Sequence, residues 1–509
     1  MYRSEGLLIG KNDKKEVYLL PKMANRHGLI TGASGTGKTI TSKVMAESLS
    51  DLGVPVFMAD VKGDLAGTAI CGEYNENIQK RVEKLKLKDF DVKEFPVRFW
   101  DVYGQKGHPI RFKVSDVGPN ILSMMLGLSE AQEGVLNIVF KVAEDEHRKL
   151  DDLKDLKSML NHVGENRSDY TLDYGNVTTQ SVGVILRSLS VLENQGLNNF
   201  FGKPDLNISD FVSVNNEGKG IINILDAVEL YKNPDLYSAV MLCLLTKLYD
   251  HMPEVGDLDK PKIVFFFDEA YFLFREMPSY RLKQVEKIVR LIRSKGIGLY
   301  FISHYTVDIP AGILDQLGNR VQHNLRAYTP ADQKIAKAAA DSFRTNPKFK
   351  TYDTILELGT GEAVVSFQNE KGEPEVCERV TILPPQSQIG TIDDSTRLRL
   401  INNSPLAGKY DETEDDDSAY EELERDRKIK EEQKIEEQRI KEEEKAKKEA
   451  EKLAEKEQKQ KEKEARELER KKKNSVPRKV GRRVASRVEG RLITKGLNAL
   501  EKALKNIGK

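Results

Sequence analysis

Short, uninterrupted apolar runs recur along the first 400 residues, and several are separated by stretches in which apolar positions recur at helical spacing. Such runs are typical of strands that are buried on both faces of a parallel sheet. The expected strands are 27–31, 54–60, 97–102, 220–225, 263–268, 298–303, 320–325 and 363–367. Because helical patterns lie between several of them, the chain is predicted to be α/β with a mostly parallel sheet.

Changes in this pattern divide the chain further. Between 120 and 212 the pattern is helical, and a Ser-x-x-Gln start at Ser129 is typical of a capped helix. We expect a small β lead-in at 1–24, the first part of the core at 25–119, a helical insertion at 120–212, the second part of the core at 213–400, an acidic linker at 401–420, a charged helix at 421–473 and a basic amphipathic tail at 474–509.

The last 100 residues are highly charged and poor in aromatic residues. Residues 411–417 include six carboxylates, which predicts a solvated linker. From 421 to 473, opposite charges four residues apart favour a helix, and the apolar residues keep no heptad. We therefore expect a single charged helix here, with a coiled coil as the alternative.

Whole-chain composition narrows the setting. The chain has 81 basic and 81 acidic residues, so net charge does not indicate a nucleic-acid or membrane partner. Three cysteines without a spacing pattern argue against a disulfide framework or a metal cluster. No apolar run approaches the length of a transmembrane helix. We expect a cytoplasmic protein without a transmembrane segment.

A glycine-rich loop follows the first confident strand and precedes a predicted helix. It fits the pattern GxxxxGK[ST], in which backbone amides and the helix N-terminus bind phosphates. The expected nucleotide-binding residues are Gly32, Ala33, Ser34, Gly35, Thr36, Gly37, Lys38 and Thr39. We expect Lys38 to reach the β- and γ-phosphates of ATP and the Thr39 hydroxyl to bind Mg²⁺. A flexible turn with a surface lysine is the alternative.

Two carboxylates end the apolar run 263–267. Asp268 is placed to hold the Mg²⁺ shell, and Glu269 is placed to polarise the attacking water, so hydrolysis is the favoured reaction. The strand at 298–303 also ends in polar residues, and Ser303 or His304 is a candidate sensor of the γ-phosphate. For His304 a structural role remains open.

Several segments together resemble the HerA-like ATPases of the HerA–FtsK superfamily. They are residues 32–39, 60–65 (DVKGDL), 285–298 (VEKIVRLIRSKGIG) and 317–323 (LGNRVQH), within a resemblance that covers 3–385. The resemblance implies a RecA-like core, Mg²⁺-dependent ATP hydrolysis and a hexameric ring in which one subunit completes its neighbour's site. His304 departs from the family, whose members commonly carry glutamine there, so the resemblance does not fix the role of the sensor.

A ring of this kind needs an arginine that acts in the neighbouring site. Arg320 is the first candidate, because its segment resembles the family's interface element, and Arg293 and Arg290 are second choices. Salt-bridge roles are the alternative for each. Residues 60–64 follow the strand beside the loop, and they are candidates either for coupling to the ring channel or for a structural turn.

What the ATPase would act on stays open. The superfamily suggests DNA, whereas the sequence shows no zinc finger or helix-turn-helix. Residues 470–483 hold eight basic and no acidic side chains, which suits DNA, an anionic membrane surface or a protein partner. A solvated basic helix that only aids assembly is the alternative. We therefore keep a ring ATPase that moves on DNA, a nucleotide-switched scaffold with slow turnover, and a motor that acts on polypeptide.

Overall fold

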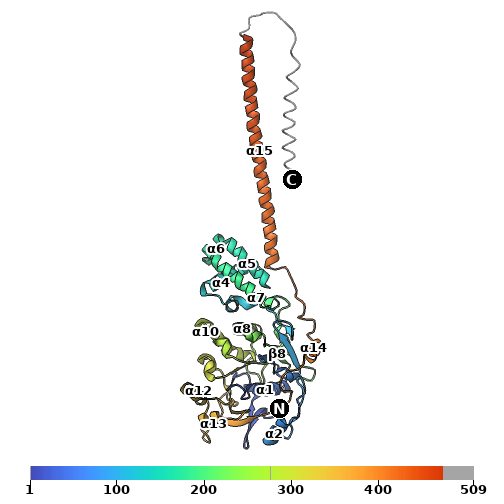
Figure 1. Cartoon of the computed structure of the whole chain (residues 1–509), viewed down its shortest axis with the longest axis vertical. Helices are drawn as coiled ribbons and strands as arrows, with labels where there is room; N and C mark the ends of the chain where they lie inside the picture. The colour runs from blue at the N-terminus through green and yellow to red at the C-terminus, as the bar shows by residue number, and fades with distance from the viewer. Residues whose placement is uncertain (1, 276, 474–509) are drawn as a thin grey trace. The chain divides into compact units, whose positions relative to one another are not determined.

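The computed structural model describes residues 2–275 and 277–473, and the chain divides into two units, residues 1–426 and 427–509. The first unit is built around one 13-stranded sheet (Figure 1). Its strands are β1 (Tyr2–Arg3), β2 (Gly6–Lys11), β3 (Glu16–Leu19), β4 (Gly28–Thr31), β5 (Val56–Asp60), β6 (Val97–Asp101), β7 (His108–Pro109), β8 (Ile222–Asp226), β9 (Ile263–Phe267), β10 (Ile297–Ser303), β11 (Asn319–Gln322), β12 (Glu362–Ser366) and β13 (Glu378–Ile382).

The sheet is parallel over its larger part, as the sequence predicts. The strand order is β1-β2-β13-β12-β11-β4-β10-β9-β5-β8-β6-β7, with β3 paired to β2. From β11 to β7 neighbouring strands run parallel, and from β11 back to β1 they run antiparallel. The eight expected strands all form, with shifts of one to three residues at their ends.

Helices cover both faces of the sheet. They are α1 (Lys38–Asp51), α2 (Glu76–Leu85), α3 (Val114–Met125), α4 (Glu130–Asp145), α5 (Leu153–Glu165), α6 (Arg167–Tyr174), α7 (Thr179–Asn194), α8 (Pro234–His251), α9 (Tyr271–Phe274), α10 (Ser279–Leu291), α11 (Ala311–Leu314), α12 (Pro330–Asp341), α13 (Thr351–Glu357), α14 (Asp394–Asn402) and α15 (Ala419–Lys473). Short 3₁₀ helices are η1 (Pro21–Met23), η2 (Ala66–Ala69), η3 (Leu197–Phe200), η4 (Ile208–Asp210), η5 (Leu230–Lys232), η6 (Ile292–Lys295) and η7 (Thr306–Asp308).

The strands alternate their side chains between two hydrophobic clusters, because successive residues of a strand point to opposite faces. In β5, Met58 packs with α1 residues in one cluster, while Phe57 packs with α8 residues in the other. Residues of β9 divide in the same way, with Phe266 in the first cluster and Phe265 in the second. This two-sided burial accounts for the nearly continuous apolar runs in the sequence.

The N-terminal strands are part of the main sheet. β2 pairs with β13 as well as with β3, and Leu7, Leu8 and Ile9 are fully or almost fully buried. The expected small β lead-in at 1–24 therefore extends the sheet on its antiparallel side.

From α3 to α7 the chain is helical, and these helices gather at one end of the unit (Figure 1). Ser129 and Gln132 form the expected capping box of α4. Apolar residues of this block, such as Leu136, Leu156 and Leu189, belong to the same buried cluster as Phe57. The insertion is therefore continuous with one layer of the core.

The segment that contains the acidic linker is anchored in the core by one residue. Within the segment 403–418, which we call the connecting segment, Tyr410 is wholly buried, and its ring meets that of Trp100 with centroids 5.7 Å apart. Arg111 donates hydrogen bonds to the carbonyl oxygens of Tyr410 and Asp411. Residues 411–417 are themselves exposed, as expected of a solvated acidic run, but the run begins directly after a residue that completes the core.

Ion pairs hold the acidic part of the connecting segment against the helical insertion. Lys154 lies 2.6 Å from Asp415, and Lys203 lies 3.0 Å from Asp416. The first turns of α15 continue this contact, since Leu423 is buried and Arg148 pairs with Asp426 at 2.6 Å. The carboxylates that suggested a solvated run thus have basic partners more than 200 residues away in the sequence.

The described part of the second unit, residues 427–473, lies within α15, one helix of 55 residues (Figure 1). Its isoleucines Ile429, Ile435 and Ile440 are exposed. A single helix, as against a coiled coil, stays a prediction. Among the expected charge pairs, Glu437 and Lys441 approach to 3.8 Å. The expected basic tail at 474–509 lies outside the described residues. In the part of the chain that is described, no helix is long and apolar enough to cross a membrane.

Candidate nucleotide site

The predicted site residues lie at one edge of the sheet, where the parallel strands β4, β5, β9, β10 and β11 end. In the register of the sheet, Thr31 at the end of β4 is opposite Ser303 at the end of β10 and opposite Gln322 at the end of β11. β10 in turn pairs with β9, after which the two carboxylates follow. Open α/β sheets bind ligands outside this edge. The structure therefore brings together the predicted loop, the acidic pair and the sensor candidates.

The glycine-rich loop connects β4 to α1. Gly32 and Gly37 have φ angles of 153° and 118°, a region that residues with a side chain rarely adopt. A Cβ on Gly32 would also lie 2.5 Å from the Cβ of His323. Lys38 begins α1, and its amine donates to the carbonyl oxygens of Gly32 and Ala33 at 2.7 and 3.2 Å. The lysine therefore lies along the loop that precedes it.

Neighbouring strands fix the loop through backbone hydrogen bonds. The amide of Gly32 donates to the carbonyl oxygen of His304 at 3.2 Å, and the amide of Ala33 donates to that of Asn324 at 2.9 Å. The carbonyl oxygen of Thr36 accepts from Gly361 at 2.9 Å. The first amides of α1 have no acceptor within the helix and form the positive end of its dipole. This combination suits a phosphate group.

The two carboxylates follow β9 directly. Glu269 has a φ of +50°, a left-handed conformation that costs a non-glycine residue about 1–3 kcal/mol. Bonds on both sides hold this conformation: the Tyr237 hydroxyl donates to the Asp268 carbonyl at 2.7 Å, and the Ala270 amide donates to Ile302 of β10 at 2.8 Å. The turn places Glu269 at the sheet edge, with 5% of its surface exposed.

Nearby positive charge compensates the acidic pair only in part. Burial, with a further contribution from Glu269, raises the pKa of Asp268 to about 6. Burial also raises the pKa of Glu269, against the opposing effect of Lys62, whose amine lies 3.9 Å from the carboxylate. A divalent cation would supply the missing charge, and the oxygen donors of Asp268 and Thr39 suit Mg²⁺.

A protein-only metal cage is absent from residues 2–275 and 277–473, where no group of three His, Cys, Asp or Glu side chains could hold a metal ion. Mg²⁺ in nucleotide sites is held by one or two protein oxygens together with phosphate oxygens and water. The predicted pair of Thr39 and Asp268 matches that pattern.

The two sensor candidates differ in their surroundings. The Ser303 hydroxyl is fully buried and donates to Asp308 at 2.6 Å, and the amide of Tyr305 donates to the same carboxylate. His304 is partly exposed, and its Nε2 lies 3.4 Å from a carboxylate oxygen of Glu269. Burial and the nearby Lys38 both lower the pKa of His304, which favours the neutral ring. The geometry thus places His304 next to the expected general base and gives Ser303 a partner in its own turn.

The three arginine candidates also differ in their contacts and exposure. The guanidinium of Arg320 donates to the carbonyl oxygens of Leu317, Ser342 and Leu314 at 3.0, 3.0 and 3.2 Å. These bonds use three of its five N–H donors within its own chain, which supports a structural role. Arg293 lies in η6, near Arg26 and His27 at the start of β4, and is partly exposed. Arg290 is exposed on α10.

The segment after β5 forms a tight turn. Asp60 accepts hydrogen bonds from the amides of Gly63, Asp64 and Leu65 at 2.7, 3.1 and 3.0 Å, so this side chain builds the turn. Burial and the neighbouring Asp64 raise its pKa to about 6. The turn also places Lys62 beside Glu269. Asp60 therefore has the structural role, and coupling of this segment to a ring channel stays a prediction.

Two side chains of this edge escaped the sequence analysis, Asp308 and His323. His323 follows β11, is wholly buried beneath the loop, and lies within the segment LGNRVQH that carried the family resemblance. Burial lowers its pKa to about 4. The sequence could have identified His323 as a site residue, because it directly follows a strand that ends at this edge of the sheet.

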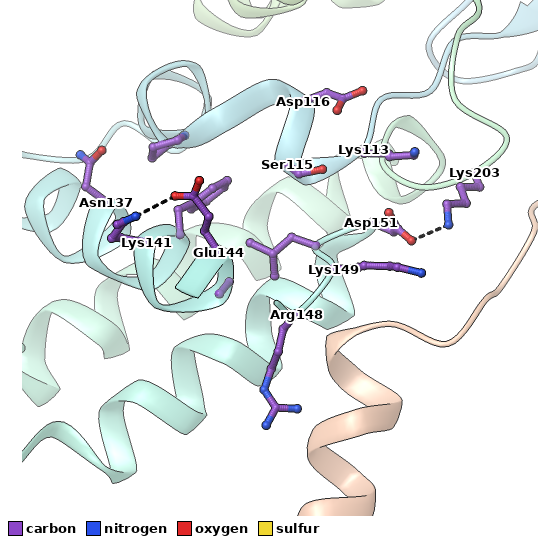
Figure 2. A pocket seen from close by; sticks show the side chains of 14 residues that line it. Lys113, Ser115, Asp116, Asn137, Lys141, Glu144, Arg148, Lys149, Asp151 and Lys203 are labelled. Carbon is purple, nitrogen blue, oxygen red and sulfur yellow. Dashed lines mark hydrogen bonds and ion pairs between the residues drawn. The ribbon is translucent and has the colours of Figure 1, made fainter. Parts of the chain in front are cut away.

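A large cavity of about 850 Å³ lies elsewhere, in the helical insertion (Figure 2). Two ion pairs form between its lining residues, Lys203 with Asp151 at 2.7 Å and Lys141 with Glu144 at 3.1 Å. Leu150 and Phe140 complete its wall. The cavity lies apart from the glycine-rich loop, and none of the predicted site residues lines it.

Two bacterial proteins are among the solved structures that have a similar fold. The conjugative coupling protein TrwBdeltaN70 is 13% identical, with 77% of this chain and 92% of that chain covered and a TM-score of 0.48. VirB4 of Thermoanaerobacter pseudethanolicus is 14% identical, with coverages of 78% and 99% and a TM-score of 0.48. A further structure of TrwB is in complex with ADP and Mg²⁺. Likeness at this level carries no conclusion about what the present chain binds.

The relatives found by sequence similarity are HerA helicases. The DNA double-strand break repair helicase HerA of Saccharolobus solfataricus is 22% identical over 373 residues, which are 71% of this chain and 65% of the relative. The protein of the same name from Sulfolobus acidocaldarius is 21% identical over 371 residues, or 71% and 66%. Both matches span slightly less than two thirds of the relatives' own length. A family model described as Helicase HerA-like C-terminal matches residues 5–503. The chain therefore belongs to the HerA-like helicase C-terminal family, which confirms the predicted class of P-loop ATPase of the HerA–FtsK type.

Proposed function

We propose that the chain binds ATP with Mg²⁺ at the glycine-rich loop and hydrolyses it. One observation carries this proposal: the loop with Lys38 and the carboxylates Asp268 and Glu269 lie at the same edge of the sheet, separated by the single strand β10. The amides of the loop and Lys38 would hold the phosphates, and Thr39 with Asp268 would hold Mg²⁺, which neutralises charge on the phosphates when bound.

Glu269 is the expected general base. Its raised pKa, together with its limited exposure, suits a carboxylate that accepts a proton from the attacking water. Lys62 and His304 lie on either side of this carboxylate, at 3.9 and 3.4 Å, and they would orient it. We assign Ser303 to the turn that positions His304, because its hydroxyl donates to Asp308.

We infer further, from membership of the family, that hydrolysis drives movement on DNA by a hexameric ring of subunits. The relatives are named as DNA repair helicases, and the chain shares their matched region. In such a ring an arginine from one subunit stabilises charge in the next subunit's site. We favour Arg293 for this role, because three of the five N–H donors of Arg320 already bond carbonyl oxygens of its own chain and anchor its guanidinium there.

The test is the ATPase rate of the full chain with and without single- and double-stranded DNA. We expect Mg²⁺-dependent turnover that DNA increases, and a loss of about 10²-fold or more in Glu269→Gln, with ATP binding retained. Glu370→Gln is the matched control, since Glu370 is exposed and remote from the loop in sequence.

The outcomes separate the candidate functions. Absence of ATP binding in folded protein would refute the proposal as a whole. Slow turnover that DNA does not change, with retained binding of a protein or of anionic vesicles by the full chain, would favour the nucleotide-switched scaffold. Stimulation by a polypeptide in place of DNA would favour a polypeptide motor.

A further inference from the structure

His323 is the centre of a buried hydrogen-bond network under the glycine-rich loop. Its backbone amide donates to Thr31 at 2.7 Å, at the residue where the loop begins. Its ring contacts two groups: Nε2 lies 2.8 Å from the Thr41 hydroxyl of α1, and Nδ1 lies 2.9 Å from the carbonyl oxygen of Glu362 at the start of β12. The ring therefore joins the helix after the loop to the strand beyond β11.

The partners determine which ring nitrogen carries the proton. The carbonyl oxygen of Glu362 can only accept, so Nδ1 must donate to it. In a neutral ring Nε2 is then an acceptor, and the Thr41 hydroxyl donates to it. Both polar atoms of the ring are satisfied only in this arrangement, which fixes the orientation of the ring and of the Thr41 side chain.

The same ring forms the floor of the loop. A Cβ on Gly32 would lie 2.5 Å from the Cβ of His323, and one on Gly37 would lie 3.4 Å from its Cε1. The next residue, Asn324, accepts the amide of Ala33, and the Gly361 amide donates to Thr36. Contacts from β11 and from the turn before β12 thus reach the loop at its start, middle and end.

We infer that His323, through its bond to Thr41, is a positioning residue that holds the glycine-rich loop and the first turn of α1 in the conformation that binds the phosphates of ATP. This inference rests on the proposed binding of ATP and is independent of DNA. Backbone amides bind a phosphate well only when they are fixed in place beforehand, because each ångström of misplacement weakens several bonds at once. The network supplies that fixation from outside the loop.

The network also extends to the surface. Arg81 of α2 donates to the carbonyl oxygen of Gly361 at 3.1 Å, next to the carbonyl that His323 binds. The Glu362 carboxylate pairs with Arg379 at 2.8 Å and with Lys84 at 3.4 Å. The turn that bears on the loop is therefore itself fixed by charged residues of α2 and β13.

Four variants of the full chain, built from three substitutions, test the inference, with affinity for ATP measured by calorimetry in the Glu269→Gln background. His323→Asn can keep a donor near Glu362 and loses the acceptor for Thr41. Thr41→Val loses the hydroxyl and keeps the shape. We expect each to weaken ATP binding about 5- to 30-fold, since a buried group loses its partner. The double variant should lose no more than the stronger single variant, because both remove the same bond. Thr41→Ser keeps the hydroxyl and should restore most of the affinity.

His27→Asn is the matched control. His27 is also buried, its pKa is likewise lowered to about 4, and it makes two hydrogen bonds, from Leu299 and to Val289, but it precedes β4 at the opposite edge of the sheet. This variant should lower the Tm and leave the affinity for ATP within about twofold.

Three results would overturn the inference. They are unchanged affinity in His323→Asn and Thr41→Val at temperatures where both are folded, an equal loss in His27→Asn, or additive losses in the double variant. If these occur while the parent binds ATP, the proposed function stands and the positioning role fails. If the parent itself binds no ATP, both fail.

Discussion

Replacing Asp268 by asparagine should stabilise the protein in the absence of divalent cations while removing its Mg²⁺-dependent hydrolysis. The folded protein holds this carboxylate with a pKa of about 6, against an ordinary value of 3.8. Each unit corresponds to about 1.4 kcal/mol, so ionisation of Asp268 at pH 7 costs the folded state about 3 kcal/mol. Asparagine removes this cost and keeps the oxygen that accepts the Glu269 amide at 2.9 Å.

We expect a gain in unfolding free energy of about 1 to 3 kcal/mol for Asp268→Asn at pH 7.5, because water and side-chain movement soften the penalty of burial. The sign of the pH dependence follows from the raised pKa. The folded state binds the proton more tightly than the unfolded state, so the parent loses stability as the pH rises from about 4 to about 6. The advantage of the asparagine variant should therefore be full above pH 6 and vanish below about pH 4.

Asp60→Asn is the control for this prediction, because Asp60 has the same raised pKa of about 6 and a different hydrogen-bond environment. Its two oxygens accept three backbone amides, and an asparagine amide would face the N–H of Leu65. This variant should be destabilised, since an unsatisfied buried donor costs about 1–3 kcal/mol.

Thermal and urea unfolding in EDTA at pH 4.5 to 8 provide the assay, followed by the Tm shift on adding MgADP. MgADP should raise the Tm of the parent protein more than it raises the Tm of Asp268→Asn, because the variant loses a metal ligand. A variant no more stable than the parent in EDTA, or an equal gain in Asp60→Asn, would refute the reasoning that uncompensated burial of charge governs this edge.

Three further predictions concern other parts of the chain. Arg320→Ala should lower the unfolding free energy by about 2–4 kcal/mol, because three carbonyl oxygens lose a charged donor. Arg293→Ala should leave the Tm nearly unchanged and lower the ATPase rate about 10³-fold. Unfolding experiments and steady-state rates distinguish the two variants, and the opposite pattern would restore Arg320 as the residue that acts in the neighbouring site. Tyr410→Ala should cost about 3–5 kcal/mol and expose Trp100, seen as a red shift of its fluorescence; an unshifted spectrum would contradict the buried contact. A peptide of residues 427–473 should show helical circular dichroism that is independent of its concentration, and an increase with concentration would indicate a coiled coil.

The central sheet was predictable from sequence because its strands are buried on both faces and so appear as continuous apolar runs. β9, with five large apolar residues before Asp268, is the clearest case. The antiparallel part was harder to predict: the pairing of β2 with β13 joins residues about 370 positions apart, and no local pattern records such a partner.

The glycine-rich loop and the acidic pair were predictable because each is a local pattern at the end of a strand. The roles of individual side chains were not, since they depend on partners distant in sequence. Arg320 is an example: its three acceptors include Ser342, beyond the next helix. His323 is another, because its ring is defined by Thr41 and Glu362, which lie on either side of it by 282 and 39 residues.

The burial of Tyr410 against Trp100 has a consequence for biosynthesis. The two residues are about 310 positions apart, so at translation rates of about 5–20 residues per second the indole is made roughly 15–60 s before the tyrosine that covers it. During that interval the nascent polypeptide presents an uncovered aromatic surface on the ribosome. Completion of the amino-terminal half therefore waits for synthesis of its carboxy-terminal cover, and a chaperone that shields aromatic patches would act in this window.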